Sequence, residues 1–258
     1  MKTKKYILVI AVLICFALIP AVTFAWFFVN DRTPMSFEML EIQSKVRLYR
    51  GNDINNNGIP DLANTETEMD YYTEKYDFEF LSEDSAMTEE KTADIKLNIE
   101  ITDIVSGQTK TFKLALENTG DADNNIDLSF NLSGLTDSEK EFLSIISVQA
   151  LKVVKGDGGS YTLEKGEKHW FSDAEQDVLG AVFSDVLPGI ATADLNNSPT
   201  DIYMDFWLWF YMEPLESVNE HRKTKNQTEL TEEQYNSFAG KSAQNLKFYV
   251  SFDVTDGN

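Results

Sequence analysis

The sequence predicts an all-β protein, an antiparallel β-sandwich or jelly roll with a few short helices. Apolar and polar residues alternate with a period of two through most segments that are rich in Val, Ile, Phe and Tyr. Gly, Asn, Asp and Pro separate these segments, and only short stretches begin with a helix-capping residue. Residues 26–258 contain no internal repeat and no linker, which predicts a single domain.

The chain begins with the three-part layout of a secretory signal peptide over residues 1–25. Three lysines precede an apolar run over residues 6–17, Pro20 ends the helix, and small residues lead to Ala25. The apolar run is shorter than the ~20 residues that a membrane span needs, although an uncleaved anchor is the alternative. We therefore predict that a signal peptidase cuts between Ala25 and Trp26. The mature protein would then be secreted, to the extracellular matrix or the cell surface, with no membrane contact after cleavage.

The charge and the cysteine content of the chain exclude some classes of function. The 258-residue chain has a formal net charge of −21, and cleavage would remove three basic residues and none of the 43 acidic ones. Nucleic-acid binding needs a basic surface to neutralise phosphates, so we expect no nucleic-acid partner. The one cysteine, Cys15, lies inside the predicted signal peptide, after Ile14 and not after the small residue of a lipoprotein signal. Many secreted proteins are held by disulfides, so a cysteine-free mature chain suggests Gram-positive export.

The expected elements follow one another with short turns. Residues 35–48 predict one or two strands, and residues 78–80 predict a short strand before a solvated loop over residues 82–91. Residues 95–101 alternate strictly, as in a half-buried strand. After these we expect paired strands over 111–117 and 126–132, a helix that begins at Thr136, and strands over 145–154 and 161–163. A loop with a short helical piece over 172–187 is expected to follow. The last expected elements are a strand over 201–212, a helix over 231–239 and a strand over 246–254.

Residues 201–212 predict the strongest strand, because both of its faces are apolar or aromatic. Such a strand is typical of the centre of a sheet that is covered on both sides. The alternative is a surface adhesin that stacks a carbohydrate on Trp207, Trp209 and Tyr211.

An Asn-rich loop is the one motif with metal-like spacing. Position 12 of the motif is Asn64, where a calcium loop of this type has a bidentate Glu, so a plain Asn-Gly turn is the alternative. Calcium is the only cofactor that we consider. Its candidate ligands, at positions 1, 3, 5, 7 and 9, are Asp53, Asn55, Asn57, Ile59 (through its carbonyl) and Asp61.

The chain resembles the TasA/camelysin family of exported Gram-positive biofilm matrix proteins. Ala25 followed by Trp26 and Phe27 is similar to precursors that a SipW-type signal peptidase cuts. The order of later segments is also similar: a Ser-Gly turn, a Phe/Leu strand, "ENTGDADNNIDLSFNL", "FLSIISVQALKV", "TDIYMDFWLWF" and "LKFYVSFDV". The resemblance lies in layout across most of the mature chain. The Asn-rich loop and the Tyr-rich stretch after it depart from that layout.

The resemblance implies an extracellular jelly-roll protein that assembles with copies of itself into biofilm fibres. The N-terminal segment of one subunit would complete the sheet of the next, because an open sheet edge has unpaired backbone groups that an extended peptide can satisfy. The donor would be residues 26–35, and its apolar part is Trp26, Phe27, Phe28 and Val29.

An enzyme is the less favoured alternative, since some camelysin-like proteins are described as metallopeptidases. A zinc peptidase of this kind carries two histidines in an HExxH helix. His169 and His221 are the two histidines here, and neither lies in that motif. A cysteine-free mature chain without a GxSxG element or a P-loop offers no other recognisable nucleophile or phosphate site. We therefore predict no enzymatic activity and no catalytic residue.

Overall fold

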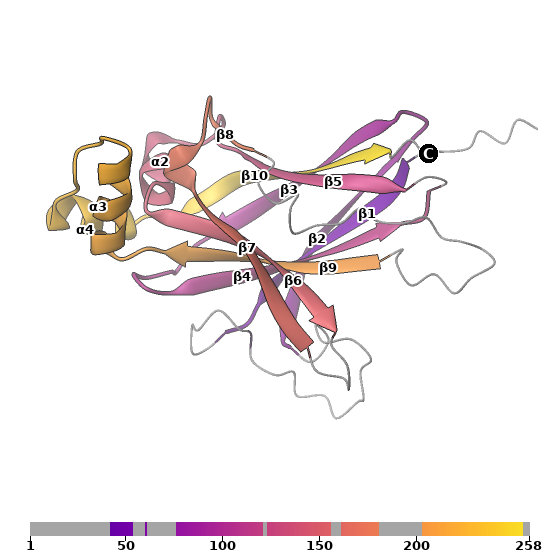
Figure 1. The fold of residues 1–258 in the computed structure, drawn as a ribbon, viewed down its shortest axis with the longest axis horizontal. Helices are drawn as coiled ribbons and strands as arrows, with labels where there is room; N and C mark the ends of the chain where they lie inside the picture. Colours follow the sequence, from indigo (N-terminus) through magenta and orange to yellow (C-terminus); the bar gives the residue numbers. More distant parts are fainter. Residues whose placement is uncertain are drawn as a thin grey trace, which may run out of the picture. The chain divides into compact units, whose positions relative to one another are not determined.

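The computed structural model describes residues 42–53, 60, 76–120, 123–155, 161–180 and 203–254, all within one compact unit over residues 40–258. These residues form two antiparallel sheets that face each other (Figure 1). One cluster of buried apolar side chains contains residues from both sheets. The predicted antiparallel β-sandwich is therefore confirmed, and the jelly-roll connection order stays a prediction.

The larger sheet has six strands, and every neighbouring pair runs antiparallel. β4 and β9 occupy its centre, and β2 and β7 are its outer strands. The strands, in spatial order, are β2 (Phe78–Thr88), β1 (Ile42–Gly51), β4 (Thr109–Asn118), β9 (Tyr203–Met212), β6 (Ile146–Lys155) and β7 (Tyr161–Trp170).

The smaller sheet has four strands, and the last strand of the chain lies inside it. β10 pairs with β3 on one side and with β5 on the other. In spatial order the strands are β3 (Thr92–Ile101), β10 (Ala243–Val254), β5 (Asn124–Asn131) and β8 (Val178–Leu179). β8 contains only two residues, which lie opposite Phe130 and Asn131.

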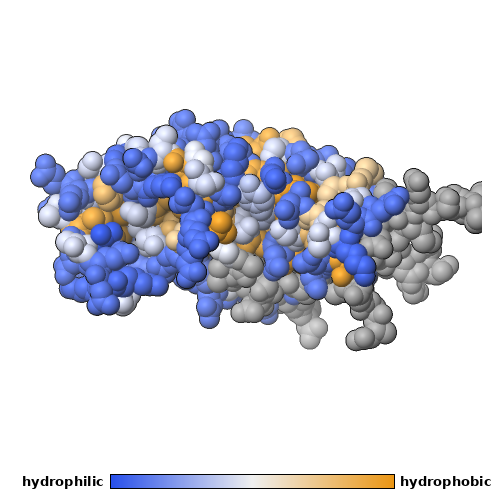
Figure 2. Space-filling model, turned by 90° about the horizontal axis from the view of Figure 1, so that it is seen from above, coloured by the Kyte–Doolittle hydropathy of each residue, from blue (hydrophilic) through white to orange (hydrophobic). Residues whose placement is uncertain are grey.

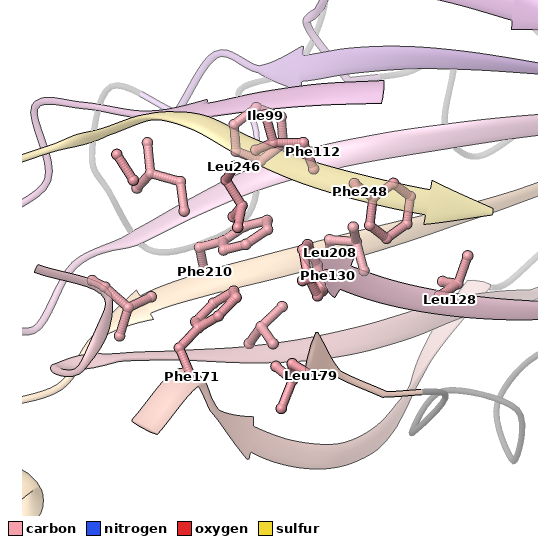
Figure 3. Close-up of a cluster of buried hydrophobic side chains, with 14 of the residues drawn as sticks. Ile99, Phe112, Leu128, Phe130, Phe171, Leu179, Leu208, Phe210, Leu246 and Phe248 are labelled. Carbon is pink, nitrogen blue, oxygen red and sulfur yellow. The ribbon is translucent and has the colours of Figure 1, made fainter. Parts of the chain in front are cut away.

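Aromatic side chains fill the space between the sheets (Figure 3). The ring of Phe210 lies edge-on to Phe112 at 5.4 Å and to Phe130 at 5.8 Å, measured between centroids. Phe248 of β10 reaches Phe130 at 4.9 Å. Such pairs contribute about 0.5–1.5 kcal/mol each beyond the area that they bury, so they help fix how the sheets face each other.

Three α-helices and one 3-10 helix lie among the described residues. α2 (Asp137–Leu143) and α4 (Glu232–Ala239) each begin with a threonine capping box, as their sequences predict. α3 (Leu215–Thr224) follows β9 directly, and the 3-10 helix η3 (Phe171–Asp173) follows β7. None of the helices in the described ranges is long and apolar enough to cross a membrane.

Two expectations about elements were wrong. The predicted solvated loop over residues 82–91 is mostly strand, because β2 pairs with β1 as far as Thr88. β4 and β5 were expected to pair, but they lie in different sheets. No element was predicted over α3, whose sequence is polar and whose one fully buried residue is Val218. The segment 161–163 proves to be the start of a longer strand, β7.

Candidate functional site

The edges of the two sheets are the features that could bind another chain. A strand at an edge has N–H and C=O groups without partners, which an extended peptide can pair with. Within the described ranges, β2 and β7 end the six-stranded sheet, and β3 and β8 end the four-stranded one.

β2 is the edge with the most exposed apolar surface. Five large apolar side chains are exposed among the described residues, and three of them belong to β2: Phe80 at 55%, Leu81 at 38% and Met87 at 62%. The face of the molecule seen in Figure 2 is mostly hydrophilic, with scattered hydrophobic residues. Exposed apolar residues on a long edge strand favour association with another chain.

Ion pairs hold β2 to β1. Arg47 of β1 donates from Nε to Glu83 at 2.7 Å and reaches Glu117 of β4 at 3.1 Å. Lys45 lies 3.5 Å from Glu83 as well. The hydrogen bond from Arg47 lowers the pKa of the Glu83 carboxyl. The carboxylate of Glu83 is therefore charged and is paired with two cations of β1.

β7, the opposite edge, carries lysines over aromatic rings of β9. The Lys165 ammonium lies 4.5 Å from the ring centroid of Trp209, and that of Lys168 lies 5.4 Å from Tyr211. Lys168 also donates to Glu213 at 2.6 Å, and Glu213 accepts from the Ser147 hydroxyl at 2.6 Å. The lysines on this face are thus positioned by rings and by a buried carboxylate.

β5 has a partly uncovered edge. β8 lies opposite only Phe130 and Asn131, whereas β5 starts at Asn124. The backbone N–H of Leu132 donates to the carbonyl of Asp177 beside β8. Because backbone groups alternate sides along an antiparallel strand, those of Ile126 and Leu128 point to the same side as Leu132. In the described part of the chain no strand meets them there.

A groove of about 480 Å³ lies between the β2 and β3 edges, next to their connecting turn. Its lining is small and polar, with two carboxylates and one exposed methionine: Ser85, Ala86, Met87, Thr88, Glu90, Thr92, Ala93 and Asp94. Within the described ranges no further strand pairs with either edge, but the lining of the groove offers little apolar surface for an apolar peptide.

The aromatic face of β9 is mostly packed. Trp207 is fully buried, and the rings of Tyr76 and Phe78 lie edge-on to it, each at 5.4 Å. This confirms that Trp207 belongs to a covered strand. Trp209 and Tyr211 are half-buried under lysines. The predicted stacking platform therefore has at most two partly accessible rings.

The predicted calcium loop falls largely outside the described residues. Asn55, Asn57, Ile59 and Asp61 are not described. Asp53 is described and lines a groove of about 440 Å³ with other carboxylates, among them Asp77, Glu100 and Asp103. Among the residues that the structure describes, no three His, Cys, Asp or Glu side chains come together as a metal site. Calcium binding stays a prediction.

The two histidines lie on different elements. His169 is on β7, and burial lowers its pKa. His221 is on α3, where its ring stacks on Trp170 at 4.2 Å and its Nε2 lies 2.8 Å from Asp173. Lys225 reaches the same carboxylate at 3.2 Å. Sequence patterns did not indicate this contact between α3 and η3, because its residues are 48 positions apart.

The cleavage pair Ala25 and Trp26, and the donor residues Trp26 to Val29, lie outside the described residues. Their roles stay predictions. A search of family models, of curated proteins and of solved structures finds no match for this chain.

Proposed function

We propose that the protein is a secreted, non-enzymatic fibre subunit of an extracellular matrix or cell surface, and that copies join by strand addition. The observation that carries the proposal is the incomplete edge of the four-stranded sheet. β8 covers two residues of the eight-residue β5. A strand laid beside Ile126 and Leu128 would extend this sheet by the same backbone hydrogen bonding that β8 begins.

The N-terminal segment of a second copy is the proposed occupant. After cleavage at Ala25, the new N-terminus would carry Trp26, Phe27, Phe28 and Val29. An apolar N-terminus is costly in water and is stabilised by burial. A donor that leaves each subunit to enter the next makes a head-to-tail contact, which gives an open filament when it does not close into a ring.

The first experiment compares the mature chain, residues 26–258, with a chain that lacks residues 26–35, by electron microscopy. We expect filaments from the first and dispersed particles from the second. A chain in which residues 26–29 are replaced by serine should behave like the deletion, whereas serine at residues 30–33 should preserve assembly. Filaments from the deletion would contradict N-terminal donation.

Hydrogen exchange then identifies the acceptor strand. In the deletion the backbone amides of Ile126 and Leu128 should exchange rapidly, because no strand among the described residues pairs with their outer side. In filaments of the mature chain, both amides should become protected. The amide of Phe248, in the interior strand β10, serves as the control and should be protected in both samples. Filaments with unprotected Ile126 and Leu128 would exclude β5 as the acceptor.

A further inference from the structure

We infer that the side chains of Lys113 on β4 and Asp205 on β9 condense to an amide, which links the two central strands of the six-stranded sheet covalently. Such an isopeptide bond forms within one chain and needs no partner. The inference therefore goes beyond the proposed function and does not depend on whether copies of the chain assemble.

The register of β4 and β9 brings the two side chains together. Asp205 lies opposite Ala115, and Lys113 comes two residues before Ala115 on the same strand. Residues two apart point to the same face of a sheet, so Lys113 and Asp205 are diagonal neighbours. Diagonal Cα atoms lie roughly 7–8 Å apart, within reach of a lysine side chain. The Lys113 Nζ lies 3.8 Å from Oδ2 of Asp205.

Both side chains are largely removed from water. The side chain of Lys113 is 9% exposed and that of Asp205 is 12% exposed. The Lys113 ammonium lies 4.4 Å from the ring centroid of Tyr49 and 5.2 Å from that of Phe78. Burial raises the pKa of the Tyr49 phenol, and the charge of Asp205 raises it as well. Two opposite charges thus share a site that is lined by aromatic rings.

The Lys113 ammonium is poorly compensated as an ion. Its distance from Asp205 is longer than a hydrogen bond, and no hydrogen bond to another described residue holds its Nζ. A buried ion pair repays the cost of leaving water when its geometry is good and hydrogen bonds satisfy the remaining groups. A neutral amide removes both charges from this site, so burial favours the condensed product over the ion pair.

A second buried carboxylate with a lysine shows the contrast. The Lys168 ammonium donates to Glu213 at 2.6 Å, so this pair is hydrogen-bonded. The side chain of Lys168 is 46% exposed, and its charge therefore stays partly hydrated. This pair is stable as ions, although its two atoms are closer than those of Lys113 and Asp205.

The condensation balances without an added reactant. The ammonium of Lys113 gives one proton to the carboxylate of Asp205, and the resulting amine attacks Cγ of the carboxylic acid. The Nζ–Cγ bond forms, one C–O bond breaks, and the leaving oxygen takes a second proton from the nitrogen and departs as water. The formal charge of the pair is zero before and after. Fixed neighbours of this kind react as if at roughly 10⁵–10⁸ M, which offsets the unfavourable loss of water.

Glu117 is placed to carry the second proton. It lies two residues beyond Ala115 on β4, so it is the diagonal neighbour of Asp205 on the side opposite Lys113. Its carboxylate accepts from Arg47 at 3.1 Å, which fixes it on this face. A carboxylate beside the reacting groups can take the proton from the nitrogen and return it to the leaving oxygen.

Mass spectrometry of the unfolded mature chain, residues 26–258, tests the bond. We expect a mass that is lower than the sequence mass by one water molecule. After digestion, the peptide that contains Lys113 should remain joined to the one that contains Asp205. Lys113→Arg should have its full sequence mass, whereas the control Lys168→Arg should keep the deficit. A wild type of full sequence mass would overturn the inference, and so would a deficit that survives in Lys113→Arg.

The rate of linkage tests the role of Glu117. Glu117→Gln should lower the linked fraction severalfold at a fixed time after synthesis. Glu83→Gln is the matched control, because Arg47 also pairs with Glu83 but Glu83 lies on β2, away from the reacting pair. Equal linked fractions in the two variants would contradict the role of Glu117. Neither outcome bears on fibre formation, which the deletion of residues 26–35 tests separately.

Discussion

Glu139 of α2 and Gln244 of β10 are joined by a hydrogen bond of 3.0 Å from the backbone N–H of Gln244 to the Glu139 carboxylate. The other carboxylate oxygen accepts from the backbone N–H and the hydroxyl of Thr136, each at 2.9 Å. One buried side chain therefore closes the first turn of the helix and ties it to the start of the last strand.

Glu139→Ala should lower the free energy of unfolding by about 1–2 kcal/mol, because it removes half of a capping box and the acceptor of part-buried backbone N–H groups. Chemical denaturation measures the change. Glu141→Ala is the control, since the Glu141 side chain is 45% exposed and its carboxylate pairs with Lys241. A control effect as large as that of Glu139 would contradict the assigned role.

Acid should weaken the same contact. Hydrogen bonds that favour the charged form lower the pKa of Glu139 to about 2, against burial, which raises it. A carboxyl with a lowered pKa in the folded state stabilises the fold above its unfolded pKa near 4.5 and loses this contribution as the pH falls toward 2. The wild type should therefore lose more stability than Glu139→Gln between pH 4.5 and 2. Parallel curves of melting temperature against pH would contradict this.

Lys168→Ala should destabilise the protein by about 1–3 kcal/mol, because it leaves the buried Glu213 carboxylate without its cation. The side chain of Glu213 is only 3% exposed, although Lys168 itself is 46% exposed. Lys223→Ala removes a pair with Glu229 in which both side chains are more than half exposed, and should change stability by less than about 0.5 kcal/mol. Thermal unfolding of the two variants compares them.

Acrylamide quenching of tryptophan fluorescence should distinguish buried from accessible indole rings. Trp207 is fully buried, so Trp207→Phe should remove fluorescence that acrylamide reaches poorly. Trp209→Phe should remove a more accessible component, since that ring is only half-buried. A glycan that alters quenching of the Trp207→Phe variant would favour the carbohydrate-binding alternative, whereas insensitivity to glycans would disfavour it.

A tight turn before β8 should accept glycine. Gln176 and Asp177 have positive φ angles of 49° and 65°, between the bridge partners Glu175 and Val178. Non-glycine residues are strained in this region, so Gln176→Gly should stabilise the protein by about 0.5–1 kcal/mol. Asp177→Gly should gain less, because Asp177 also pairs with Lys140 at 2.8 Å. Denaturant midpoints give the comparison.

The alternating segments were predictable from the sequence, because period-two hydrophobicity places side chains on opposite faces. β3 and β10 follow that rule along most of their lengths. β2 does not, since Ser82, Asp84 and Ser85 interrupt its apolar residues, and it is a strand because β1 pairs with it. The sequence also does not indicate that β4 and β5 lie in different sheets, because partner choice depends on contacts with distant segments.

The candidate site was accessible to sequence reasoning only in part. The apolar residues after Ala25 suggested a donor strand, but no local pattern marks the acceptor. A strand is an edge strand when no other strand pairs with one of its two sides. Whether that is so depends on the order of all strands in the sheet. In the same way, Lys165 and Lys168 of β7 lie over aromatic rings of β9, about 40 residues further along the chain. No local sequence pattern indicates these contacts.

The position of β10 bears on when the protein can fold. β10 lies between β3 and β5, and its residues pair with segments more than 100 positions earlier. The four-stranded sheet therefore cannot close until residues 243–254 have left the ribosome, and pairing over such sequence distances is slow. The core that the two sheets share is thus completed only when the last segment of the chain has been made, and a chain that ends before residue 243 lacks the strand that joins β3 to β5.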